Sequence, residues 1–403
     1  MKKILLIILI FVLGAFSIVF GRLLASEVVG EIPNNNENVT INDPIDIPKV
    51  EPIYEEPQVI ENTKIDLAVV GDIMFHMPQI TGAKREDGFD FYEPFKYILP
   101  FISKADYSMA NFETVTVGNE KGFSGFPMFN SPVETIDGIG RAGFDLLFTS
   151  NNHSLDRGKS GIINTIKEIE SRDIDFVGTS VDERRAYIIK EINGIKLAIF
   201  SYTQALNGLE TRLSSEELDK MINRIDIDMI KEDFLIAMEE NPDYTIIYLH
   251  WGNEYNRDSS DFQKKLAKEL AQIGFDLVLG SHPHVIQEME TILEFGKETH
   301  VIYSMGNFIS NQRYETMGVS YTEDGVIMNI TLNKNHLEEK TTLVSVKAIP
   351  TWVYRYWQDN RFNYYILPTE DILDGSLNME LSEEILKRIE KSRNDTLSKL
   401  KLD

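Results

Sequence analysis

The chain of 403 residues is 42% hydrophobic, so it is long enough for one large domain or two ordinary domains with a substantial core. Its 64 acidic and 40 basic residues give a net charge of -24, which argues against binding nucleic acid through phosphate contacts. The absence of cysteine excludes disulfides, thiolate zinc sites and cysteine nucleophiles.

The first 25 residues form the clearest targeting signal in the chain. Lys2 and Lys3 precede an uncharged apolar run over residues 4–21, which is long enough to cross a bilayer as a helix. Because the two lysines would stay in the cytoplasm, this helix predicts a single-pass anchor in the cell membrane with the main domain on the extracellular side. A signal peptide cleaved near Ala25 is the alternative, and it predicts a secreted protein.

Residues 26–62 predict an extended linker. The stretch 31–62 holds five of the 14 prolines, and its charges are mostly acidic, so it lacks the apolar content for a core. We expect a main domain over residues 63–350 and a C-terminal extension over residues 351–403, which ends in an amphipathic helix.

Beyond the linker, apolar runs typical of buried strands alternate with helical patterns. Residues 161–173, 214–225 and 258–274 have helical periodicity, and the last of these segments ends at Gly274, a plausible helix C-cap. This alternation predicts an α/β fold. After Gly325 the pattern changes to strands without long helices, which predicts either an antiparallel edge or a second sheet. The strands expected before that point are 67–70, 107–110, 146–149, 197–201, 245–249, 277–279 and 301–304.

Polar side chains of the metal-ligand type recur directly after these strands. Singly, each is typical of a turn or a loop, but five of the seven histidines fall in such clusters. Since ligands bind at the carboxyl ends of strands in open α/β sheets, we expect these groups to converge on one site. The set consists of His76, Asp72, Asn111, Glu113, Asn151, Asn152, His153, Asp156, His250, Glu254, His282, His284 and Asn307.

This set offers nitrogen and oxygen ligands without sulfur, which suits Mn, Fe or Zn and predicts a site for two divalent metal ions. Pro283 separates His282 from His284 and has a fixed φ. We expect Pro283 to bias His282 towards extended backbone and to aim the two imidazoles at neighbouring ions.

Six strings in order along the chain resemble the CapA family of capsule and poly-γ-glutamate synthesis proteins, which is similar to the calcineurin-like metallophosphoesterases. They run from Asp72 to Phe308 and read GDIM, ANFET, NNHSLDRG, HWGNEY, GSHPHV and YSMGNFI. The resemblance implies a four-layer αββα sandwich, with two mixed sheets between helices. It also implies a membrane-anchored protein that acts outside the cell in capsule or poly-γ-glutamate biosynthesis.

The resemblance also implies roles for single residues. Asp72 and His284 would bind the first metal ion, Glu113 would bridge, and Asn152, His250 and His282 would bind the second. His153, with Asp156 near it, would act as the catalytic acid that protonates a leaving group. The groups expected to contact substrate or to orient ligands are Asn111, Asn151, Glu254, Asn307 and His76.

Two positions depart from the superfamily pattern. Met74 stands where a histidine ligand is usual, and Glu113 replaces a shorter aspartate. These departures predict a weaker first metal site.

The sequence leaves more than one function open. One hypothesis is a metal-dependent, phosphoesterase-like hydrolase acting on a phosphoester or an amide. The alternative is a non-catalytic assembly or export protein that binds an anionic polymer or membrane-bound polymer synthase subunits. A generic exported phosphoesterase is a third reading, because a fold does not fix a function. All three share the cytoplasmic membrane as a partner through the N-terminal helix, and none involves nucleic acid.

Overall fold

The computed structural model describes residues 61–401. The predicted membrane anchor and nearly all of the predicted linker lie outside these residues. Within residues 61–401, no helix combines the length and the apolar character needed to cross a membrane.

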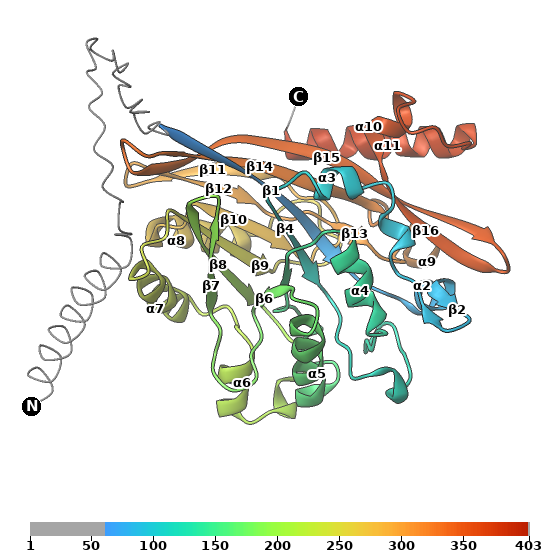
Figure 1. The fold of residues 1–403 in the computed structure, drawn as a ribbon, viewed down its shortest axis with the longest axis horizontal. Coiled ribbons are helices and arrows are strands. Elements are labelled where there is room, and N and C mark those ends of the chain that lie inside the picture. The colour runs from blue at the N-terminus through green and yellow to red at the C-terminus, as the bar shows by residue number, and fades with distance from the viewer. Residues whose placement is uncertain (1–60, 402–403) are drawn as a thin grey trace, which may run out of the picture. The chain divides into compact units, whose positions relative to one another are not determined.

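Two sheets dominate the described part of the chain (Figure 1). The first has the order β16-β15-β14-β1-β4-β5-β6, and β13 also pairs with β1. Strands β1, β4, β5, β6 and β13 are parallel, whereas β14, β15 and β16 add an antiparallel edge to the same sheet. The strands are β1 (Asn62–Ile73), β4 (Tyr107–Phe112), β5 (Leu146–Phe148), β6 (Asp175–Val177), β13 (Asn307–Ile309), β14 (Asp324–Asn335), β15 (Lys340–Gln358) and β16 (Arg361–Pro368).

The second sheet has the order β11-β12-β10-β9-β8-β7. Its four central strands are parallel, and β7 and β11 are antiparallel edges. Both sheets are therefore mixed, and the predicted α/β fold is confirmed. The strands are β7 (Tyr187–Ile192), β8 (Ile195–Thr203), β9 (Tyr244–His250), β10 (Leu277–Ser281), β11 (Met289–Glu294) and β12 (Lys297–Ile302).

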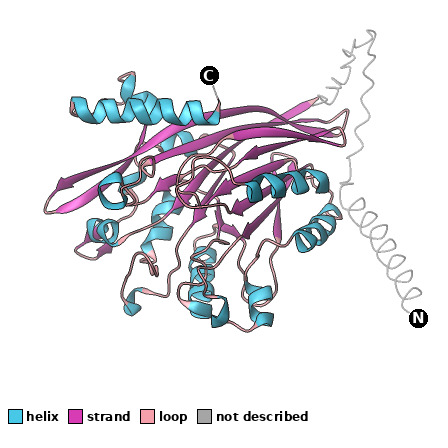
Figure 2. Ribbon diagram, turned by 180° about the vertical axis from the view of Figure 1, so that it is seen from behind, coloured by secondary structure: helices cyan, strands magenta, loops and turns pink. Residues whose placement is uncertain are grey.

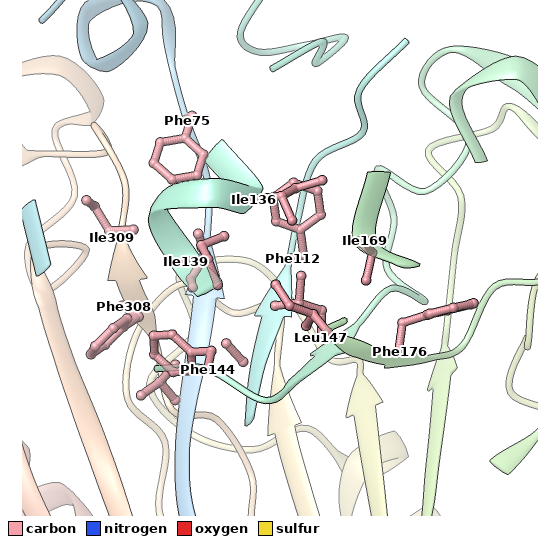
Figure 3. Close-up of a cluster of buried hydrophobic side chains, with 14 of the residues drawn as sticks. Phe75, Phe112, Ile136, Ile139, Phe144, Leu147, Ile169, Phe176, Phe308 and Ile309 are labelled. Carbon is pink, nitrogen blue, oxygen red and sulfur yellow. The ribbon is translucent and has the colours of Figure 1, made fainter. Parts of the chain in front are cut away.

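The two sheets pack face to face. Alternate residues of both sheets, such as Leu67 and Val69 of β1 and Leu277 and Leu279 of β10, form one buried cluster between them. Helices α2 (Met77–Ala83), α4 (Glu134–Arg141) and α5 (Gly158–Glu170) cover the outer face of the first sheet, as Figure 3 shows for Ile136, Ile139 and Ile169. Helices α7 (Ile227–Met238) and α8 (Asp261–Ile273) cover the outer face of the second. The packing thus has four layers in the order α, β, β, α.

Local sequence explains where these helices begin and end. In α8, the Ser260 side chain accepts a hydrogen bond from the Gln263 N–H at 3.3 Å, and the helix ends at Gly274 with a φ of 117°. The predicted C-cap is confirmed, since a positive φ favours glycine. The remaining short elements are β2 (Lys84–Arg85), β3 (Gly88–Phe89), α3 (Leu99–Ile102), α6 (Ser215–Met221) and α9 (Tyr314–Met317).

The C-terminal segment joins the first sheet. Strand β15 runs without interruption through residue 350, where the sequence analysis places the end of the main domain. Helices α10 (Thr369–Leu373) and α11 (Glu383–Leu400) pack on β15 and β16 through Trp352, Leu367 and Ile389. Both views show α11 running alongside the antiparallel edge of the first sheet, which β14, β15 and β16 form (Figures 1 and 2). The predicted amphipathic helix is thus packed against the first sheet.

Candidate metal centre

The carboxyl ends of four strands meet at one edge of the sandwich. In the first sheet, Asp72 near the end of β1 is in register with Asn111 near the end of β4. In the second, His250 at the end of β9 is in register with Ser281 at the end of β10. The His282 N–H, just after β10, lies 3.3 Å from Asp72 Oδ2. Ligand-type residues of both sheets are therefore in contact.

The centre contains two sets of ligands that share Glu113. The first set is Asp72, Glu113 and His284, and the second set is Glu113, His250 and His282. Within each set the ligand atoms lie within 4.8 Å of one another. A carboxylate common to two sets of nitrogen and oxygen donors is the arrangement that a pair of divalent ions requires.

The second set gathers around one nitrogen of His250. His250 Nε2 lies 3.0 Å from Asn152 Oδ1, 3.1 Å from His282 Nδ1 and 3.5 Å from Glu113 Oε1. On the opposite side of the ring, Nδ1 lies 3.1 Å from Ser281 Oγ. A hydrogen bond from Nδ1–H to that hydroxyl would leave Nε2 free to bind a metal ion, which is the usual tautomer of a ligating histidine.

The first set is oriented in the same way. His284 Nδ1 lies 3.0 Å from Asn307 Oδ1 and 3.1 Å from Asp72 Oδ2, while Nε2 lies 3.7 Å from Glu113 Oε1. Asn111 donates a 2.8 Å hydrogen bond to Asp72 Oδ1. An Nδ1–H shared by amide and carboxylate oxygens again leaves Nε2 directed at Glu113.

The surroundings of Glu113 show whether the residues of the centre are suited to bind metal ions. Its side chain is fully buried, and neither carboxylate oxygen has a hydrogen-bond partner. Burial, together with the nearby charge of Asp72, raises the pKa of Glu113 well above its usual range. An unpaired buried carboxylate is costly unless a cation neutralises it, so the residues fit bound cations.

Burial also keeps His250 and His282 neutral, which is the state that binds metal ions. It lowers the pKa of His250 well below the usual value. Burial and then the neighbouring His284 lower the pKa of His282 to about 3. For Asp72, burial opposes ionisation, but the hydrogen bond and charge of His284 outweigh it, so the pKa of Asp72 is lowered. Asp72, His250 and His282 are therefore deprotonated at neutral pH, whereas Glu113 needs a cation to favour its charged form.

His153 lies beside the second set and is held by two contacts. Its Nδ1 lies 2.8 Å from Asp156 Oδ2, which also accepts a 2.6 Å hydrogen bond from the Phe129 N–H. The Phe129 ring meets His153 edge-on with a centroid distance of 4.7 Å. With Nδ1 engaged by a carboxylate, Nε2 of His153 is the nitrogen left for substrate.

Phe129 also packs edge-on against His76, with a centroid distance of 5.3 Å. His76 precedes α2, and its Nδ1 accepts a 3.3 Å hydrogen bond from the Asn311 N–H. Among residues 61–401, no group of potential metal ligands contains His76. Met74, at the position that departs from the superfamily pattern, is buried.

The loop after β10 has a strained backbone. His282 has a φ of 100° and His284 a φ of 59°, values that are uncommon outside glycine. The expectation that Pro283 holds His282 in extended backbone is therefore wrong, because the contacts of both imidazoles and of the His282 N–H outweigh the local preference. Ahead of this loop, a Cβ on Gly280 would lie 2.1 Å from the Tyr303 carbonyl oxygen, so only glycine fits there.

Comparison with known proteins identifies the family. Residues 66–312 match the family described as bacterial capsule synthesis protein PGA_cap, which is more than half of the chain. The chain belongs to this family. The capsule biosynthesis protein CapA of Bacillus anthracis is 28% identical over 286 residues, 68% of this chain and 66% of that protein. The PGA biosynthesis protein CapA of Bacillus subtilis is 27% identical over 279 residues, 67% of this chain and 68% of that protein. The matched region thus spans about two thirds of each relative's length.

Solved structures with a more distant likeness include the calcineurin-like phosphoesterase YfkN of Bacillus subtilis, with a TM-score of 0.43 at 12% identity, covering 84% of this chain and 98% of that one. The NAD nucleotidase NadN of Haemophilus influenzae gives a TM-score of 0.45 at 10% identity, covering 85% of this chain and 64% of that one.

The segment of this PGA_cap protein that matches the family contains every site residue proposed from the sequence. The structure brings nearly all of them into one network. Asn151 donates a 2.9 Å hydrogen bond to the Phe112 carbonyl behind the ligands, and exposed Glu254 forms a third potential ligand group with His282 and His284. His76 lies at the edge of this network.

Two polar groups of the centre have little or no signal in the sequence. Ser281 lies against His250 Nδ1, and its only signal was its place between Gly280 and His282. Asn207 Oδ1 accepts a 3.3 Å hydrogen bond from Asn152 Nδ2. Asn207 follows no predicted strand, so no pattern in the sequence indicates it.

Proposed function

We propose that this protein is a metal-dependent hydrolase that acts in the synthesis of a bacterial capsule of the poly-γ-glutamate type. The observation that supports this most strongly is the position of Glu113, a buried carboxylate without hydrogen-bond partners that belongs to both ligand sets. Membership in the capsule synthesis family supports the biological role.

The ligands proposed for the first ion are Asp72, Glu113 and His284, and those for the second are Glu113, Asn152, His250 and His282. When bound there, a pair of divalent ions, Mn, Fe or Zn, would supply Lewis-acid chemistry.

The residues around the ligands would donate a proton and orient the imidazole rings. His153, oriented by Asp156 through Nδ1, would give a proton from Nε2 to the leaving group. Asn307 and Ser281 would keep His284 and His250 in the tautomers that expose Nε2. The substrate would be a phosphoester or an amide linkage of an anionic polymer.

We propose that residues 1–25 anchor the protein in the cytoplasmic membrane and that the main domain works on the extracellular side. The two lysines and the apolar run after them support this placement. Membrane-bound subunits of a polymer synthase are the proposed protein partners.

The test combines metal analysis with hydrolysis of a generic phosphodiester by the full-length protein. Wild type should hold close to two divalent ions per chain, and His282→Ala should lower both the metal content and the rate, the rate by about 100-fold or more. His300→Ala is the matched control, because His300 lies outside the centre, 3.0 Å from Thr291 Oγ1. Wild type without metal, or a His282→Ala variant with unchanged metal content and rate, would refute the proposal.

One observation favours the non-catalytic alternative. Met74 supplies no metal ligand where the superfamily has a histidine, so the first ion has fewer donors than the second. If the first ion is not bound for this reason, the centre would hold one ion and would bind the polymer without cleaving it. A purified protein that holds metal but cleaves neither phosphodiesters nor poly-γ-glutamate would support this alternative.

A further inference from the structure

A second candidate site lies away from the metal centre, in a cleft between α11, β15 and the segment 313–323. Its volume is about 630 Å³, within the range of small-molecule sites. Its lining residues include five cationic side chains in a chain whose net charge is -24. These are Arg313, Arg355, Lys387, Arg388 and Lys391.

Three carboxylates, Glu315, Glu323 and Glu384, also line the cleft. Buried Glu323 neutralises part of the positive charge, since its two oxygens lie 2.6 Å from Arg313 Nη2 and 3.1 Å from Arg388 Nη2. Lys387 is exposed. Two further carboxylates hold other cations of the cleft, since Asp324 Oδ1 lies 3.2 Å from Arg388 Nη2 and Asp395 pairs with Lys391. Within residues 61–401, the cation that is left free to reach a ligand is therefore Lys387.

Glu315 marks the position where two of the cations accept an anion. Its Oε2 lies 3.4 Å from Arg313 Nε and 3.7 Å from Arg355 Nη2. The Glu315 side chain is 61% exposed, whereas the Arg313 side chain is 6% exposed and its Nε has no hydrogen-bond partner. A buried guanidinium with a free N–H, facing a loosely held carboxylate, is a site at which a ligand carboxylate can replace the protein's own.

Aromatic rings form the apolar part of the same cleft. Trp352 and Tyr354 stack with a centroid distance of 6.0 Å, and the Arg313 guanidinium lies 5.8 Å from the Trp352 ring centroid. Because Trp352 is 4% exposed, Tyr354 offers most of the apolar surface that could cover the methylene groups of a chain whose carboxylates contact the arginines.

The cleft is linked to the metal centre through the residue before Arg313. Gln312 Oε1 accepts a 3.0 Å hydrogen bond from Asn307 Nδ2, and Asn307 Oδ1 lies 3.0 Å from His284 Nδ1. The residue next to Arg313 is thus joined to a ligand of the centre by two hydrogen bonds.

We propose that this cleft binds the carboxylate groups of a γ-linked glutamate polymer and holds the polymer beside the metal centre. The assignment rests on the proposed function for the choice of polymer. Two features favour a carboxylate over a phosphate: the group already at the arginines is a carboxylate, and three acidic neighbours would repel a dianion more strongly.

Calorimetric titration of the full-length protein with a short γ-linked glutamate oligomer in EDTA tests this assignment. Glu315→Gln removes the internal competitor and should tighten binding roughly two- to five-fold, whereas Lys387→Gln should weaken it by a similar factor. Lys264→Gln is the matched control, since Lys264 is an exposed lysine of α8 outside the cleft, and it should bind like wild type.

Oligomer binding with these opposite shifts would support the cleft. Absence of binding, or equal shifts in all three variants, would overturn it. Inorganic phosphate that binds with the same pattern while the oligomer does not would overturn the choice of a carboxylate polymer. Because EDTA removes the metal ions, these outcomes are independent of the hydrolysis assay, so either proposal can fail alone.

Discussion

Glu113 gives the sharpest test of the metal centre, because its burial has opposite consequences with and without cations. Both of its oxygens lack hydrogen-bond partners, and an unpaired buried polar group costs about 1–3 kcal/mol. Methionine has a similar length and no charge, so Glu113→Met should leave no large cavity. Without metal, we expect the variant to have a free energy of unfolding about 1–3 kcal/mol higher than wild type.

Metal ions should change the difference in the free energy of unfolding between wild type and Glu113→Met. An ion that binds only the folded state at 100 times its Kd stabilises that state by about 2.7 kcal/mol. Because Glu113 belongs to both ligand sets, Glu113→Met should lose this gain for both ions. Wild type should therefore become more stable on adding Mn²⁺ or Zn²⁺, whereas the variant should not respond.

Urea unfolding of wild type and Glu113→Met measures both effects. Unfolding in EDTA gives the cost of burying the Glu113 carboxylate, and unfolding in excess metal gives the stabilisation by bound ions. Asp233→Leu is the control, because Asp233 is also buried but accepts hydrogen bonds from Arg184 at 3.0 Å and Tyr202 at 2.7 Å. This control should be destabilised by about 1–3 kcal/mol, equally with and without metal. If Glu113→Met lowered stability in EDTA as Asp233→Leu does, the reasoning would be refuted, since Glu113 would then be a bonded structural group.

Three further predictions concern the surroundings of the centre. Gly280→Ala places a Cβ 2.1 Å from the Tyr303 carbonyl oxygen, so urea unfolding should show a loss of about 1–3 kcal/mol and metal analysis a lower content; unchanged metal content would contradict this. His153→Asn should lower kcat by about 10²–10⁴ on an alkyl phosphodiester and less on a nitrophenyl ester, with metal content unchanged, whereas equal losses would argue against an acid. Burial opposes ionisation of Glu288, but hydrogen bonds from Ser259 and Lys399 lower its pKa to about 2. The stability it adds is present above the ordinary value of 4.5 and is lost as pH falls through 2, so Glu288→Gln should cost about 1 kcal/mol at pH 7 and nothing near pH 2. A pH-independent difference in unfolding would contradict this account.

The positions of the parallel strands could be predicted because burial on both faces leaves a short apolar run that ends at polar residues. Residues 277–279 lie inside β10, and His282 and His284, one ligand of each set, follow this strand. The positions of the antiparallel strands β14, β15 and β16 in the sheets could not be predicted in the same way. Whether residues after Gly325 extend the first sheet or form another depends on β14 pairing with β1 from Asn62 onward, a contact between the two ends of the domain.

Site residues at strand ends could be predicted, whereas the orientation of their side chains could not. The backbone of His282 and His284 follows from hydrogen bonds to Asp72, His250 and Asn307, which lie on three other strands. Such contacts outweigh the preference that Pro283 imposes on its neighbour. Local rules therefore find the donors, and only the packing of the two sheets decides which nitrogen faces Glu113.

The family match also separates the two proposed sites. It ends at Gln312, and every residue that lines the cleft follows it, beginning with Arg313. The metal centre therefore lies wholly within the segment shared with the family, whereas the cleft belongs to the part of the sheet and to α11 beyond it. If chemistry resides in the shared segment and polymer recognition in the rest, variants of Lys387 or Glu315 should change polymer affinity without changing metal content. Variants of His282 should do the reverse, which makes the two functions separable in a single protein.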